Sequence, residues 1–207
     1  MCFSEEASLG ALLIGLSGSA LVYYKGTVYD KIFALFMGFV SFMQGIEWLL
    51  WRHQTCDTYH KTVSLLGFFL NGLQPFVLGA LVIIFTQKNV FPILCTLFIY
   101  SLITALYAIQ YTSDLHCTIQ HKGDPHLLWN WTIMPYYVIT WITYITSVMI
   151  ICMLGMPTMG TAIFSATGML LTMIASIILY PRQHMGAMWC YFSTFLPIIY
   201  YTYRSFI

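Results

Sequence analysis

The sequence has 207 residues, of which 59% are hydrophobic and only 7% are charged, with a formal net charge of +1. Soluble domains carry about 25% charged residues, so this composition excludes a chain whose whole surface faces water. The small net charge and the scattered Lys and Arg residues also exclude the basic surface of a nucleic-acid-binding protein. We therefore predict an all-α integral membrane protein whose apolar exterior is solvated by the lipid bilayer.

Seven apolar runs approach or exceed the roughly 20 residues that a helix needs to cross the hydrocarbon core. In chain order they are Ala7–Tyr24, Ile32–Trp51, Thr62–Thr86, Phe91–Tyr111, Ile133–Leu154, Thr161–Tyr180 and Ala187–Tyr203. We expect a bundle of seven transmembrane helices that forms one domain over residues 1–207. No basic leader precedes the first run, so we interpret it as a retained helix and not as a cleaved signal.

An odd number of spans puts the two ends of this chain on opposite sides of the membrane. We call the N-terminal side "side A" and the other "side B". Lys and Arg are divided four and four between the sides, so the positive-inside rule gives no orientation. All six His residues and five of the seven acidic residues fall on side A. Side A is therefore the expected working face, and we predict that it is exoplasmic or lumenal.

Two features of the side-A loops fit that orientation. Cys56 and Cys117, in the second and fourth connections, would pair as a disulfide in an oxidising compartment. The sequon Asn130-Trp131-Thr132 offers Asn130 as a glycosylation site. The alternatives are two free thiols and an unused sequon.

Polar side chains recur at helical spacing on the second and third helices. Because such groups are costly in hydrocarbon, they usually face the bundle interior and often mark function. We predict that four of them, together with Gln110 of the fourth helix, line a cavity open to side A with the carboxylate as its charged site: Glu47, Gln44, Asn71 and Gln74. The alternative is that they only bond one another, at about 0.6 kcal/mol per pair.

The His-rich loops also suggest a zinc site, because zinc takes His, Cys and carboxylate ligands at short spacings. The candidate ligands are His53, His116 and His184. No C-x-x-C or H-E-x-x-H motif supports them. Retinal and haem are excluded, since every Lys lies in a loop or at a helix end and no His lies inside a predicted helix.

The opening Met1-Cys2-Phe3-Ser4-Glu5-Glu6-Ala7-Ser8, followed by Gln44-x-x-Glu47-x-x-x-Trp51, resembles a functionally uncharacterised family of small multi-helix membrane proteins from bacteria and large DNA viruses. The resemblance covers the first helix and the end of the second, and Trp48 replaces a Gly that often follows the Glu in that family. It implies that Cys2, Ser4, Gln44, Glu47 and Trp51 belong to one side-A feature. It implies no activity.

These observations favour a non-enzymatic membrane protein that binds or conducts a small polar solute or ion through a side-A cavity. One alternative is a metal-assisted intramembrane hydrolase that uses Glu47 with the candidate zinc ligands. Another is a structural or assembly protein of a viral or host membrane. The sequence does not identify the substrate. It also does not show whether the protein forms a homo-oligomer.

Overall fold

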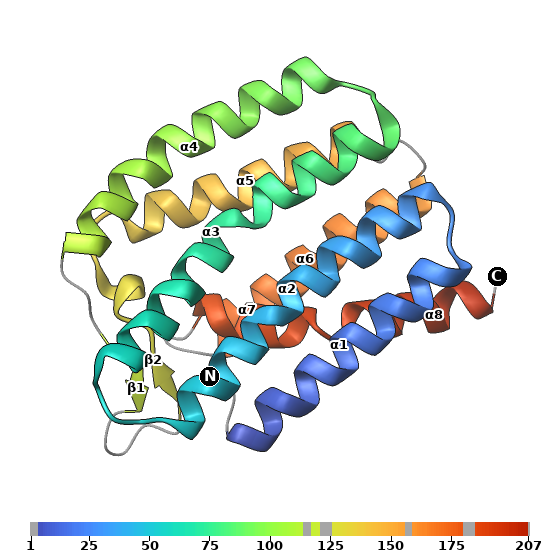
Figure 1. Ribbon diagram of the computed structural model, residues 1–207. Coiled ribbons are helices and arrows are strands. Elements are labelled where there is room, and N and C mark those ends of the chain that lie inside the picture. The colour runs from blue at the N-terminus through green and yellow to red at the C-terminus, as the bar shows by residue number, and fades with distance from the viewer. Residues whose placement is uncertain (1–3, 114–116, 121–125, 156–158, 180–184, 207) are drawn as a thin grey trace.

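The computed structural model describes residues 4–113, 117–120, 126–155, 159–179 and 185–206 (Figure 1). Its elements are α1 (Glu5–Lys25), α2 (Val28–Arg52), α3 (Thr58–Thr86), α4 (Val90–Ser113), β1 (Ile119–Gln120), β2 (Leu127–Leu128), the 3-10 helix η1 (Asn130–Ile133), α5 (Tyr137–Gly155), α6 (Met159–Leu179), α7 (Met185–Ser193) and α8 (Leu196–Ser205). The long helices run side by side along one direction, so their ends gather at two opposite ends of the bundle. The predicted all-α helical bundle is confirmed, with α7 and α8 together forming its seventh segment.

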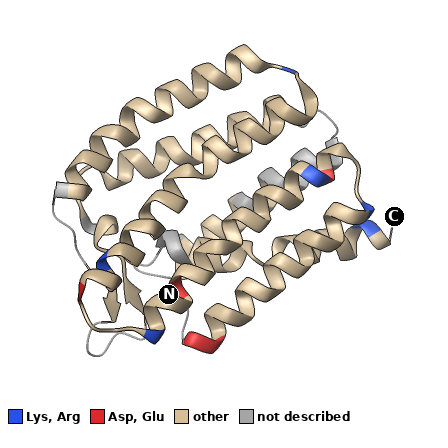
Figure 2. Cartoon of the chain, in the orientation of Figure 1, with Lys and Arg blue, Asp and Glu red and all other residues tan. Residues whose placement is uncertain are grey.

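The helices have the length and composition of membrane spans. Within the described residues, α1 to α5 are each long and apolar enough to cross a membrane, and α6 has 21 residues without a charged side chain. Figure 2 shows the described charged residues near the two ends of the bundle, with the middle almost free of them. These features are those of a multi-pass membrane protein.

The side chains that begin the helices explain several of their boundaries. Ser4 caps α1, accepting a hydrogen bond at Oγ from the backbone N–H of Ala7 at 3.2 Å. Thr27 and Asp30 form a reciprocal capping box at the start of α2. The carboxylate of Asp57 caps α3 by accepting from the N–H of His60 at 2.9 Å. These caps satisfy backbone donors that have no partner inside the helix.

The last predicted span, Ala187–Tyr203, is not one helix. It is divided into α7 and α8, with a turn at residues 194–195. Pro197 stands in the first turn of α8, where its missing N–H costs nothing, whereas its ring would clash with the carbonyl of Ser193 in a continuous helix. A proline inside a helix kinks or breaks it, and here the helix is divided in two.

The fifth helix begins at Tyr137 and not at the predicted Ile133. Pro135 keeps the residue before it, Met134, in an extended conformation (φ −71°, ψ 153°), and Tyr136 has a left-handed φ of 66°. The preceding residues fold over the end of the bundle instead. They form η1 and a short antiparallel pair of strands in which Ile119 is opposite Leu128, none of which was predicted.

Helix α2 lies at the centre of the bundle and contacts α1, α3, α6, α7 and α8. Large apolar side chains such as Phe33, Phe36 and Met43 are completely or almost completely buried along it. Helix α4 lies at the outside, and side chains such as Leu106 and Ile109 are more than two-thirds exposed. Because lipid solvates that surface, these exposed apolar residues stabilise the membrane-inserted state.

Candidate functional site

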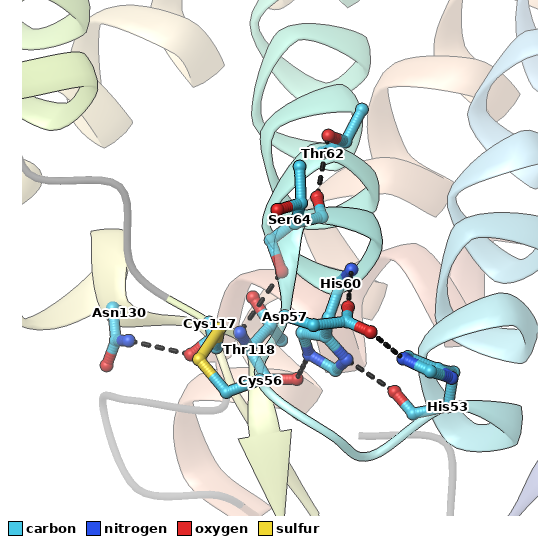
Figure 3. Close-up of a disulfide and its surroundings, with 10 residues drawn as sticks. His53, Cys56, Asp57, His60, Thr62, Ser64, Cys117, Thr118 and Asn130 are labelled. Atoms are coloured by element: carbon cyan, nitrogen blue, oxygen red, sulfur yellow. Dashed lines mark hydrogen bonds and ion pairs between the residues drawn. A yellow bond between two sulfur atoms is a disulfide. The ribbon is translucent and has the colours of Figure 1, made fainter.

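A folded cap lies at the side-A end of the bundle, and a disulfide joins its two parts. Cys56, in the connection between α2 and α3, is bonded to Cys117, which precedes β1 (Figure 3). Their Cα atoms are 5.7 Å apart, a usual separation for a disulfide. This is the pair that the sequence singled out. The bridge ties the short α2–α3 connection to the α4–α5 connection, which lies 61 residues further along the chain.

His60 lies beside the disulfide and is completely buried. Its Nδ1 contacts the carbonyl oxygen of His53, and its Nε2 lies 2.7 Å from the carbonyl oxygen of Thr118. A carbonyl oxygen only accepts hydrogen bonds, so the His60 ring acts as a hydrogen-bond donor in this arrangement. His60 thereby connects the end of α2, the start of α3 and the strand segment.

The sequon residue Asn130 packs into the same cap. Its Nδ2 donates to the carbonyl oxygen of Cys117 at 2.8 Å, and the Thr132 hydroxyl donates to the carbonyl of Trp129 at 2.7 Å. Trp131 and Thr132 are buried. The Nδ2 atom that would carry a glycan thus makes a contact within the cap, and glycosylation of Asn130 stays a prediction.

The connection between α2 and α3 carries the described candidate zinc ligand, His53. Its Nε2 lies 2.8 Å from Oδ2 of Asp57. The hydrogen bonds from the His60 backbone N–H and from the His53 ring hold the pKa of Asp57 below its usual range. Among the described residues no group of three His, Cys, Asp or Glu side chains is arranged to hold a metal ion. His116 and His184 lie outside the described residues, so the zinc site stays a prediction.

A layer of aromatic rings lies beneath the cap. Trp129 is fully buried and stacks on Trp131 with 4.8 Å between ring centroids. Its indole Nε1 donates to Oε1 of Glu47 at 3.4 Å. The Trp129 ring fits against Gly67 of α3, where an added Cβ would lie 2.6 Å from a ring carbon. A glycine at this position therefore allows the Trp129 ring to lie against α3 and reach Glu47.

The N-terminus of α1 is attached to the side-A end of α2. Oε1 of Glu5 accepts from the indole Nε1 of Trp48 at 3.2 Å and lies 3.3 Å from Nε of Arg52. The Arg52 guanidinium also lies 5.2 Å from the centre of the Trp48 ring. Trp48, which stands where the family that the sequence resembles often has Gly, thus provides a specific contact between the two helices. Cys2 lies outside the described residues.

Below the aromatic layer, α3, α4, α5 and α7, with Met43 of α2 and Trp131 of η1, line a cavity of about 60 Å³. We call it the aromatic cavity, because eight of its fourteen lining residues are aromatic: Phe68, Tyr100, Tyr107, Trp131, Tyr137, Trp141, Tyr144 and Trp189. The remaining lining residues are Met43, Asn71, Gly72, Thr104, Thr140 and Cys190. None of the fourteen is charged. A cavity of this volume can hold a few water-sized molecules.

Three tyrosine hydroxyl groups of the lining are oriented by hydrogen bonds that they donate to other protein groups. Tyr100 donates to the carbonyl of Gly72 at 3.0 Å, and Tyr107 donates to the carbonyl of Trp131. Tyr144 donates to Oε1 of Gln74. Each hydroxyl has one hydrogen, so its oxygen is left to act as an acceptor.

The five residues predicted to line a cavity are thus divided. Asn71 does line the aromatic cavity. Glu47, Gln44 and Gln74 are fully buried and do not line it. Instead Gln74 accepts a hydrogen bond from Tyr144, and Glu47 accepts one from Trp129. These two side chains therefore orient aromatic residues without lining the cavity themselves. Gln110 is half-buried near the side-A end of α4 and does not line the cavity either.

Sequence reasoning missed the aromatic residues of the cavity. Tyr100, Thr104 and Tyr107 recur at helical spacing on α4, and this pattern was visible. Hydroxyl groups at such intervals usually bond within their own helices, so the pattern alone favoured a structural interpretation. The contribution of Trp131 depends on the fold of the α4–α5 connection, which helical periodicity does not describe.

Neither a protein-family model, nor a curated protein, nor a solved structure matches this chain.

Proposed function

We propose that this membrane protein binds a small polar solute or ion in the aromatic cavity, which the solute reaches from side A. The observation that supports the proposal is the combination of Asn71 with oriented tyrosine hydroxyls in a space of about 60 Å³. Binding sites for small molecules are typically apolar pockets with a few oriented polar groups. Polar groups inside a membrane bundle are costly to bury, and those that are present often mark functional sites.

Binding is favoured over conduction by the placement of the cavities. A second cavity, of about 430 Å³, is lined by side-B residues that include Lys25, Asp30 and Arg204. It shares no lining residue with the aromatic cavity. A conducting path would have to pass between the two, through the tightly packed side chains around α2.

The disulfide supports the predicted orientation. Structural disulfides persist in oxidising compartments and are rare in the cytosol. The bridge between Cys56 and Cys117 lies in the side-A cap. We therefore propose that side A, with the start of α1, faces the exoplasm or an organelle lumen. A solute would then reach the cavity from outside the cytosol.

Replacing Asn71 tests the function. We expect Asn71→Leu to abolish the binding of small polar solutes to purified protein in a maltoside detergent, as measured by ligand-observed NMR with a panel of water-soluble compounds of two to four heavy atoms. The matched control is Thr146→Leu, which adds the same side chain at an exposed position of α5. Parent protein that binds no compound in the panel would contradict the proposal, as would equal binding by both variants.

A further inference from the structure

We infer that the aromatic cavity selects a small ammonium cation, a proposal that rests on the function given above. The first support is the composition of the lining. A cation within about 6 Å of the centre of a Trp, Tyr or Phe ring is attracted by the negative face of the ring. Eight aromatic residues border a space of only about 60 Å³, so a cation inside it would contact several rings at once.

The rings of the lining surround this space from several helices. Phe68 of α3 packs against Trp131 at 5.2 Å between centroids and against Tyr107 at 5.8 Å. Tyr144 of α5 packs against Trp189 of α7 at 5.5 Å. These contacts fix the orientation of the rings before any ligand arrives. A preformed set of rings loses little side-chain entropy on binding.

The second support is the direction of the hydroxyl hydrogen bonds. Besides the three tyrosines described above, Thr104 and Thr140 donate to the carbonyls four residues earlier in the chain, those of Tyr100 and Tyr136. The hydrogens of five lining hydroxyls are therefore committed elsewhere, and their oxygens can only accept. An ammonium group carries donors and no acceptor, so it matches these groups, whereas a carboxylate does not.

The third support is the charge around the cavity. No lining residue is charged, and one acidic residue, Glu47, lies behind the aromatic layer, bonded to the Trp129 that stacks on Trp131. No positively charged side chain therefore borders the cavity to repel a cation. The uncharged lining, the hydroxyl acceptors and the aromatic rings all favour a positively charged ligand.

Three probes of similar size and different charge test the inference: methylammonium, methanol and formate. We expect methylammonium to bind at a single saturable site in the detergent-solubilised protein, with a Kd on the order of 10 mM, as expected for so few heavy atoms. NMR titration with the ¹³C-labelled compounds at constant ionic strength measures this. Methanol and formate should bind at least roughly fivefold more weakly.

Variants of a single ring show where binding occurs. Trp141→Leu removes a ring from the lining, and we expect it to weaken methylammonium binding by roughly threefold or more, whereas Trp141→Phe retains most of the affinity. Trp51→Leu removes an indole that does not line the cavity and should leave the affinity unchanged. Equal losses in Trp141→Leu and Trp51→Leu would contradict the assignment.

The outcomes separate this inference from the proposed function. If methanol or formate binds in an Asn71-dependent way and methylammonium does not, the ammonium assignment is wrong while the cavity still binds a solute. If none of the three probes binds, the ammonium assignment is wrong, and the panel measured with Asn71→Leu decides separately whether any solute binds. Saturable methylammonium binding that depends on Trp141 supports both.

Discussion

The two ends of the bundle are held together by different chemistry. On side A, a disulfide and a buried histidine fix a folded cap over the helix ends. On side B, the connections are short, and the ends of α1, α2 and α8 meet through Asp30, whose carboxylate accepts from Tyr200, Thr27 and Arg204. The comparison indicates that a covalent cross-link is placed where the aromatic cavity needs rigid walls. Hydrogen bonds and an ion pair to one buried carboxylate are sufficient where the helices only turn.

The largest difference between the ends should come from the disulfide. We expect Cys56→Ser to destabilise the protein by about 3 kcal/mol, because a cross-link across a long loop restricts the unfolded chain. Thermal unfolding in detergent, with and without a reductant, measures the loss. Cys95→Ser, at an exposed free cysteine, is the matched control. An unchanged melting temperature in Cys56→Ser would show that the cap does not depend on the bridge.

Beneath the cap, Gly67→Ala should cost about 2 kcal/mol, since its Cβ would overlap the Trp129 ring and over-packing is destabilising. Gly10→Ala is the control, because nothing lies within 4 Å of an added Cβ there. It should leave stability unchanged or raise it slightly. Chemical denaturation followed by tryptophan fluorescence compares the two. Similar results for both would mean that Trp129 does not pack tightly on α3.

On side B, we expect Asp30→Asn to cost about 1.5 kcal/mol, because it weakens charge-assisted hydrogen bonds to Tyr200 and Arg204. The melting temperature should fall while methylammonium binding stays at the parent value, since Asp30 does not line the aromatic cavity. A change in affinity would show that the two ends are coupled.

The smallest effect concerns Asp57, whose pKa is lowered in the folded protein from a usual value of 3.8. A carboxyl group with a depressed folded pKa contributes stability above its unfolded pKa, and this contribution is lost as the pH falls through the folded pKa. We expect a slight decrease in melting temperature below pH ~4 that is reduced in Asp57→Asn, which keeps a capping side chain. Identical pH profiles would contradict this.

Much of the fold could be predicted from the sequence because hydropathy and helix length act locally. Glu47, Gln44 and Gln74 were expected to turn inward, and all three are buried. Their role could not be predicted, because it depends on tertiary partners such as Trp129. The cap escaped prediction for a related reason. Pro135 and the left-handed Tyr136 delay the start of α5, and only the tertiary structure shows that the freed residues fold back over the cavity.

The proposed opening of the aromatic cavity to side A is tested most directly at two neighbouring residues of α5. Thr140 lines the cavity, whereas the side chain of Ile139 is 55% exposed on the lipid-facing surface. In sealed vesicles, we predict that Thr140→Cys reacts with a membrane-impermeant thiol reagent added on side A, that methylammonium slows the reaction, and that Ile139→Cys does not react. Labelling of Ile139→Cys but not Thr140→Cys would contradict the account.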